Sequence, residues 1–129
     1  MTPRTVVVAD DETLLRESLC DLITDLGLVA RSAKNGQGAM EILAHGPCDL
    51  VLSDVDMPDM TGFTLLGWIR EHHPVPAVLM SARANDRLDD EAHRAGALAL
   101  WAKPVQAGTV TKLLHTLFDD PLASGRPSL

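Results

Sequence analysis

Five polar residues of this sequence have side chains that could together bind a metal ion and a phosphoryl group. They are Asp10, Asp11, Asp54, Ser81 and Lys103. Three carboxylates that are held close together repel one another and should bind a divalent cation. All-oxygen ligation by few protein groups favours Mg²⁺. A carboxylate can also act as a nucleophile and form an acyl phosphate, with a lysine and a hydroxyl group stabilising the charge of the transferring group.

The segments that carry these residues alternate between two patterns. Short continuous apolar runs predict strands that are buried on both faces, and apolar residues at helical spacing predict helices. Strands are predicted at 6–9, 28–33, 49–53, 77–81 and 97–102, and helices at 14–26, 37–44, from 63 to before Pro74, 86–95 and 109–118. Strands that alternate with helices predict an α/β fold, a doubly wound sheet of five parallel strands flanked by five helices.

The five polar residues fall at the carboxyl ends of four of these strands, where open parallel sheets bind their ligands. Asp10 and Asp11 follow the first strand, Asp54 the third, Ser81 ends the fourth, and Lys103 follows the fifth. Asp54 is the predicted phosphoacceptor because its strand is central and the residues after it permit a tight loop. If these five residues had no shared function, their positions at one edge of the sheet would require five independent coincidences.

Taken singly, each residue has an ordinary structural interpretation. Asp10 or Asp11 could cap the first helix, since Asp is a favoured N-cap residue. Ser81 could cap the fourth helix or bind a loop amide. Lys103 could be an exposed surface lysine, and Asp54 a loop carboxylate.

Composition limits the classes of function. The 129 residues suffice for one domain, and a formal charge of −7 with a pI near 5.0 argues against binding to nucleic acid or an anionic membrane. No apolar run approaches the ~20 residues of a membrane span. Cys20 and Cys48 have no metal or redox spacing, and the N-terminus lacks a signal peptide pattern. We expect a soluble cytoplasmic domain at 1–118, followed at 119–129 by a tail or the start of a linker to an output domain.

In combination, these motifs resemble the receiver domains of two-component response regulators. The resemblance covers about residues 4–118. It rests on Asp10-Asp11-Glu12, the run from Asp49 to Gly62 that contains Asp54 and Pro58, Ser81-Ala82, Ala95-Gly96-Ala97 and Lys103-Pro104. It implies a flavodoxin-like, CheY-like fold and a signalling phosphoacceptor that assists its own phosphorylation and dephosphorylation, rather than an enzyme.

The resemblance also implies a role for each acidic residue. Asp54 would take a phosphoryl group from the phosphohistidine of a histidine kinase or of a histidine phosphotransfer protein. Asp11 and Asp54 would ligate Mg²⁺ directly, Asp10 would act through water, and the Asp56 backbone carbonyl would complete the protein ligands.

The remaining roles concern the phosphoryl oxygens and the output. Ser81 and the Ala82 backbone N–H would bind one oxygen and Lys103 another, and the peptide before Pro104 would be cis. Phosphorylation would shift a conformational equilibrium on the face made by the fourth helix, fifth strand and fifth helix. That face could pair two copies of the domain, which itself would bind neither nucleic acid nor membrane.

One position departs from the family pattern. Leu100 stands where the family usually has Tyr or Phe, three residues before the lysine, and Trp101 lies beside it. The usual aromatic switch is therefore absent. We expect Trp101, or a shift of the weakly anchored fourth helix itself, to report the state of the site.

Three alternatives compete with this interpretation. Asp54-Val-Asp56 superficially matches the paired aspartates of haloacid dehalogenase phosphatases, but that family places the pair after its first strand and has no proline at the position of Pro58. A receiver could also act as a docking or dimerisation module without phosphorylation. A flavin-binding flavodoxin would need a phosphate loop after the first strand, where Asp10, Asp11 and Glu12 would repel phosphate.

Overall fold

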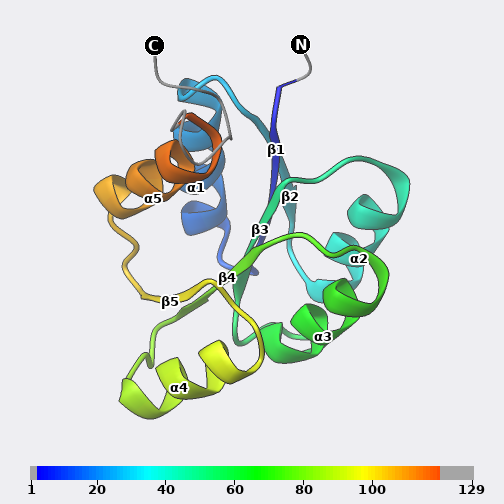
Figure 1. The fold of residues 1–129 in the computed structure, drawn as a ribbon, viewed down its shortest axis with the longest axis vertical. Coiled ribbons are helices and arrows are strands. Elements are labelled where there is room, and N and C mark those ends of the chain that lie inside the picture. Colours follow the sequence, from blue (N-terminus) through cyan, green and yellow to red (C-terminus); the bar gives the residue numbers. More distant parts are fainter. Residues whose placement is uncertain (1–2, 120–129) are drawn as a thin grey trace, which may run out of the picture.

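The computed structural model of the protein describes residues 3–119 and contains one sheet of five parallel strands in the order β2-β1-β3-β4-β5 (Figure 1). The strands are β1 (Thr5–Ala9), β2 (Val29–Ala33), β3 (Leu50–Asp54), β4 (Ala77–Ser81) and β5 (Ala99–Ala102). The helices are α1 (Thr13–Asp25), α2 (Gly36–His45), α3 (Gly62–His72), α4 (Asp86–Arg94) and α5 (Ala107–Leu114), followed by a π-helix, η1 (His115–Asp119). The predicted fold class is confirmed.

The helices cover both faces of the sheet, because successive side chains of a strand point to opposite faces. On β1, Val6 and Val8 pack with buried residues of α1 and α5, whereas Val7 packs with those of α2, α3 and α4. Figure 1 shows α1 and α5 together on one side of the strands and α2 and α3 on the other. The three central strands are buried along their whole length. Their carboxyl ends are therefore rigid supports for the residues that follow.

Some predicted boundaries were wrong, chiefly at helix ends. The second strand begins at Val29, because the Leu28 N–H still donates to the Ile23 carbonyl at the end of α1. The fifth strand begins at Ala99, because the Ala97 N–H likewise donates to the Ala92 carbonyl of α4. The predicted last helix at 109–118 is α5, which starts earlier, followed by the π-helix.

Glycine ends two helices as the sequence predicts. Gly27 and Gly96 have φ angles of 85° and 95°, a left-handed conformation that glycine adopts without strain. Three helices start with side-chain caps: Asn35 on α2, Thr61 on α3 and Asn85 on α4. Ser81 therefore does not cap α4.

The two cysteines are not bonded to each other, and burial raises the pKa of both thiols. Within residues 3–119, no helix has both the length and the apolar character needed to cross a membrane. The predicted tail at 119–129 lies, beyond its first residue, outside the described part of the chain.

Candidate functional site

Three carboxylates converge at the carboxyl edge of the sheet. Asp10 and Asp11 follow β1, and Asp54 ends β3. The strands β1 and β3 are direct neighbours in the sheet. Oxygens of the three side chains lie within 4.8 Å of one another. Asp10 and Asp54 are buried, while Asp11 is exposed. The cluster is thus open to solvent on one side, and its oxygens are close enough together to hold one metal ion.

Asp10 provides the best test of whether the site suits a cation. Its side chain is completely buried, and Oδ1 accepts a hydrogen bond of 2.8 Å from the Glu12 N–H. Oδ2 pairs with Lys103 Nζ at 2.9 Å and has no other partner among the described residues. Burying a carboxylate is costly unless positive charge lies nearby, and the one ammonium group that Asp10 shares with Asp54 leaves the cluster of three carboxylates with an excess of negative charge. A hard divalent cation fits this donor set.

Lys103 supplies a positive charge to the same cluster. Its Nζ lies 2.9 Å from Asp10 Oδ2, 3.3 Å from Asp54 Oδ2 and 3.6 Å from Glu12 Oε1, and its side chain is only 12% exposed. Burial alone would lower the pKa of this ammonium group, but the interactions with Asp10 and Asp54 outweigh burial and raise the pKa. Lys103 is therefore a charged, largely buried residue of the site and not an exposed surface lysine.

Asp54 has an unusual electrostatic environment. Burial and the negative charge of Asp10 raise the pKa of its carboxyl group, although the Asp56 N–H and Lys103 partly oppose the shift. The Asp56 N–H donates to Asp54 Oδ1 at 3.3 Å. The excess of negative charge around Asp54 means that a bound cation would stabilise its ionised, nucleophilic form.

Glycine is required immediately beside Asp54. A Cβ atom on Gly62 would lie 2.5 Å from the Asp54 carbonyl oxygen, and the Gly62 N–H donates to the Val55 carbonyl. The loop between β3 and α3 therefore folds back tightly onto the end of β3, as its sequence predicts.

In the same loop, the Asp59 carboxylate accepts hydrogen bonds from the N–H groups of Gly36 and Gln37, which lower the pKa of Asp59. This ties the loop to the start of α2.

Ser81 lies at the end of β4, the other neighbour of β3. The residue is buried, and its Oγ accepts a 2.9 Å hydrogen bond from the Arg83 N–H. The ordinary structural role considered for Ser81, binding a loop amide, is thus present, while its predicted role at a phosphoryl group stays a prediction. Ala82 is exposed.

Asp56 and Arg83 form an ion pair that the sequence interpretation did not include. One guanidinium nitrogen of Arg83 lies 2.8 Å and 2.9 Å from the two Asp56 carboxylate oxygens. The only signal in the sequence was that each residue stands two positions after a residue of the site, Asp54 or Ser81. The sequence also contained no indication of a second contact, in which a guanidinium N–H of Arg16 on α1 donates to the Asp10 backbone carbonyl at 2.8 Å.

The expected switch residues lie on β5 and just after it. Leu100 packs against the core shared with α2, α3 and α4, whereas Trp101 packs against the core shared with α1 and α5. The peptide between Lys103 and Pro104 is cis, as the resemblance implies. Leu100, Trp101, Lys103 and Pro104 also line one surface cavity of about 400 Å³.

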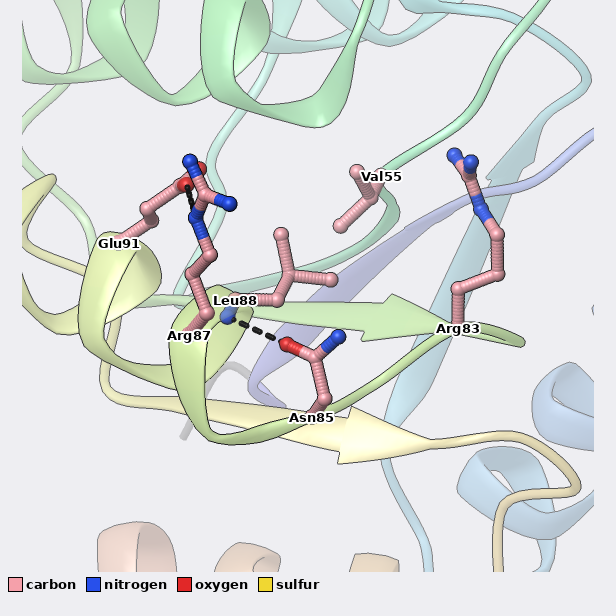
Figure 2. Close-up of a pocket in the computed structure, with 6 residues that line it drawn as sticks. All are labelled: Val55, Arg83, Asn85, Arg87, Leu88 and Glu91. Atoms are coloured by element: carbon pink, nitrogen blue, oxygen red, sulfur yellow. Dashed lines mark hydrogen bonds and ion pairs between the residues drawn. The ribbon is translucent and has the colours of Figure 1, made fainter.

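A second cavity, of about 280 Å³, lies beside α4 and not over Asp54. It is lined by Val55, Arg83, Asn85, Arg87, Leu88 and Glu91 (Figure 2). Figure 2 shows that the Arg83 side chain extends away from α4, while Arg87 reaches toward Glu91 on the helix. Arg83 thus lies in the loop between β4 and α4, with its side chain directed toward Asp56 and not toward the helix.

Comparison with known proteins agrees with this geometry. A family model described as the response regulator receiver domain matches residues 6–115. The response regulator protein PilR of Pseudomonas aeruginosa is 34% identical over 117 residues, which cover 90% of this chain and 26% of PilR. The chain spans about a quarter of the length of such curated relatives. The match favours the receiver interpretation over a phosphatase or a flavin-binding protein.

Solved structures show the same fold. A receiver domain protein of Methanospirillum hungatei superposes with a TM-score of 0.86 at 21% identity, over 96% of this chain and all of that one. The receiver domain of Ssk1 from Saccharomyces cerevisiae, crystallised with the histidine phosphotransfer protein Ypd1, gives a TM-score of 0.81 at 22% identity over 90% of each chain. With its family model matched over almost the whole described chain, this protein belongs to the response regulator receiver domain family.

Proposed function

We propose that Asp54 is the residue of this receiver that accepts a phosphoryl group. The observation that carries the proposal is the buried Asp54 carboxylate, which lies with Asp10 and Asp11 on one side and with the Lys103 ammonium 3.3 Å away. This arrangement offers a nucleophile, a set of metal ligands and a cation at one point of the sheet edge.

Mg²⁺ is the proposed cofactor, held by carboxylate oxygens of Asp11 and Asp54, by Asp10 through water, and by the Asp56 backbone carbonyl. The three carboxylates, whose negative charge Lys103 offsets only in part, support a cation at this position. When bound, Mg²⁺ supplies positive charge that stabilises the transferring phosphoryl group.

The chain's own residues would carry the transfer. An Asp54 oxygen attacks phosphorus while the bond from phosphorus to the donor nitrogen breaks, and the nitrogen keeps the electron pair of that bond. Lys103 would bind one phosphoryl oxygen, and the Ser81 hydroxyl with the Ala82 N–H another. The products are an acyl phosphate on Asp54 and a donor histidine that is neutral because its other ring nitrogen carries a proton during the transfer.

The proposed donor is a phosphohistidine on a histidine kinase or histidine phosphotransfer protein, and the proposed location of this domain is the cytoplasm. The complex of Ypd1 with the Ssk1 receiver supports this class of partner, because that receiver has the same fold. The proposed output is a change on the α4, β5 and α5 face, which could pair two copies of the domain. The proposal assigns signalling, and no catalysis beyond the domain's own phosphorylation and dephosphorylation.

Phosphoramidate tests the proposal because its P–N bond mimics phosphohistidine. Incubation with Mg²⁺ should add one phosphoryl group to the wild type and to Asp90→Asn, a control at an exposed acidic residue of α4, but none to Asp54→Asn. Intact-protein mass spectrometry measures the product. Equal modification of Asp54→Asn would refute the assignment of Asp54, and equal modification in excess chelator would refute that of Mg²⁺.

A further inference from the structure

The Asp56–Arg83 ion pair bridges the two loops that flank Asp54. Asp56 stands in the loop after β3, and Arg83 stands in the loop after β4. None of the roles described above uses the side chain of Arg83. Because the pair joins two loops of the site, Asp56 connects Asp54 with Arg83.

Backbone contacts bring both partners of the ion pair next to the phosphoryl position. The Asp56 N–H donates to Asp54 Oδ1, and the Arg83 N–H donates to Ser81 Oγ. Arg83 therefore touches, through its backbone, the hydroxyl group proposed to bind a phosphoryl oxygen. Through its side chain it touches the residue whose amide binds the phosphoacceptor.

The ion pair is weak enough to be exchanged. The side chains of Arg83 and Asp56 are 76% and 53% exposed, and exposed pairs contribute only about 0–1 kcal/mol to stability. A phosphoryl group on a side chain carries a charge of about −1.5 to −2 near neutral pH, and guanidinium groups bind phosphate oxygens bidentately. A phosphoryl group on Asp54 would thus compete effectively with Asp56 for the guanidinium.

We propose that Arg83 is a second cationic phosphoryl-binding residue, whose guanidinium leaves Asp56 and binds the phosphoryl group on Asp54. The inference rests on the proposed function of Asp54. Lys103 is already paired with Asp10 and Asp54, whereas Arg83 is paired only with the exposed side chain of Asp56. Arg83 can therefore supply an additional positive charge to the phosphoryl group.

The exchange would also connect the phosphoryl group to α4 through the loop that carries Arg83. Arg83 stands two residues before Asn85, whose side chain accepts a hydrogen bond from the Leu88 N–H and caps α4. Only Ala92 of α4 is buried, so few packing contacts hold the helix in place and a movement of Arg83 could displace its first turn. This link acts without an aromatic residue at Leu100.

Beryllofluoride with Mg²⁺, a phosphoryl mimic, provides the test, with affinity measured by fluorine NMR on the whole domain. Arg83→Met should weaken binding about tenfold, and Arg83→Lys should restore part of the loss. Arg87→Met is the matched control, because it removes an arginine of the same cavity that pairs instead with Glu91. It should bind as the wild type does. Thermal melting checks that each variant is folded.

Asp56→Asn should have the opposite effect, since it frees Arg83 and should strengthen binding about threefold. The gain should vanish in the Asp56→Asn, Arg83→Met double variant. Wild-type affinity in Arg83→Met, or a gain that persists in the double variant, would overturn the role of Arg83 alone. Failure of the wild type to bind, or equal binding by Asp54→Asn, would instead overturn the proposed function and this inference with it.

Discussion

Lys103 Nζ lies 3.3 Å from Asp54 Oδ2, although β4 separates their strands in the sheet. The lysine side chain therefore reaches across the end of β4, where it is almost buried, and it also lies 2.9 Å from Asp10. One ammonium group thus offsets two buried carboxylates. This relationship explains how the domain keeps a dense cluster of negative charge at its sheet edge and remains folded.

Removal of that ammonium should destabilise the domain. Lys103→Met leaves Asp10 and Asp54 without their buried cation and should lower the free energy of unfolding by about 3 kcal/mol. Excess Mg²⁺ should restore more stability to this variant than to the wild type, since the metal would replace the lost charge. Urea unfolding with and without Mg²⁺ measures both effects. Lys112→Met, at an exposed position of α5, is the control, and an equal cost in the two variants would contradict the account.

Asp54→Asn should stabilise the domain at neutral pH in the absence of metal. The folded-state pKa of Asp54 is raised, so its contribution to stability is fully present below the unfolded-state pKa. That contribution is lost as pH rises through the folded-state pKa. Replacement by neutral Asn should therefore increase the free energy of unfolding by about 1 kcal/mol at neutral pH, and the gain should shrink as the solution becomes acidic. Urea unfolding over a pH series tests this, and a gain that grew toward acid pH would have the wrong sign.

Gly62→Ala should damage both the fold and the site. The new Cβ would lie 2.5 Å from the Asp54 carbonyl oxygen, a backbone atom that cannot move without displacing Asp54. We expect a loss of about 3 kcal/mol in unfolding free energy and slower modification by phosphoramidate. Gly67→Ala on the same helix is the matched control, because its Cβ would meet nothing within 4 Å. It should gain about 0.5–1 kcal/mol from the lower entropy of the unfolded chain. Similar effects in both variants would show that the contact with Asp54 is unimportant.

Phosphorylation should change the fluorescence of Trp101, which lines one cavity with Lys103 and Pro104. Trp68, which stacks on His72 on α3, would obscure the signal, so the measurement needs a Trp68→Phe background. Beryllofluoride with Mg²⁺ should shift the Trp101 emission, while Asp54→Asn in the same background should show no change. An unaltered spectrum on beryllofluoride binding would remove Trp101 from the switch.

Sequence patterns predict the sheet and most of this site for a simple physical reason. Buried parallel strands are almost continuously apolar, so polar residues gather at the carboxyl end of each one. Asp10, Asp54 and Lys103 are brought together by topology alone, without any need to know side-chain conformations. The same logic fails at helix ends, where Leu28 and Ala97 are apolar but bond to the preceding helix.

The Asp56–Arg83 pair shows the other limit. Both side chains are mostly exposed, so neither hydrophobic periodicity nor burial identifies them. Their contact depends on the path of two loops and on the conformation of a long side chain. Such contacts can be identified only from the three-dimensional structure of the loops.

The most direct test of the central claim is chemical identification of the modified residue. After incubation with phosphoramidate and Mg²⁺, borohydride reduction converts an aspartyl phosphate to homoserine, which peptide mass spectrometry locates in the sequence. The account predicts homoserine at position 54, formed only when Mg²⁺ is present. Homoserine at any other aspartate, or none in a protein that has taken up phosphate, would contradict it.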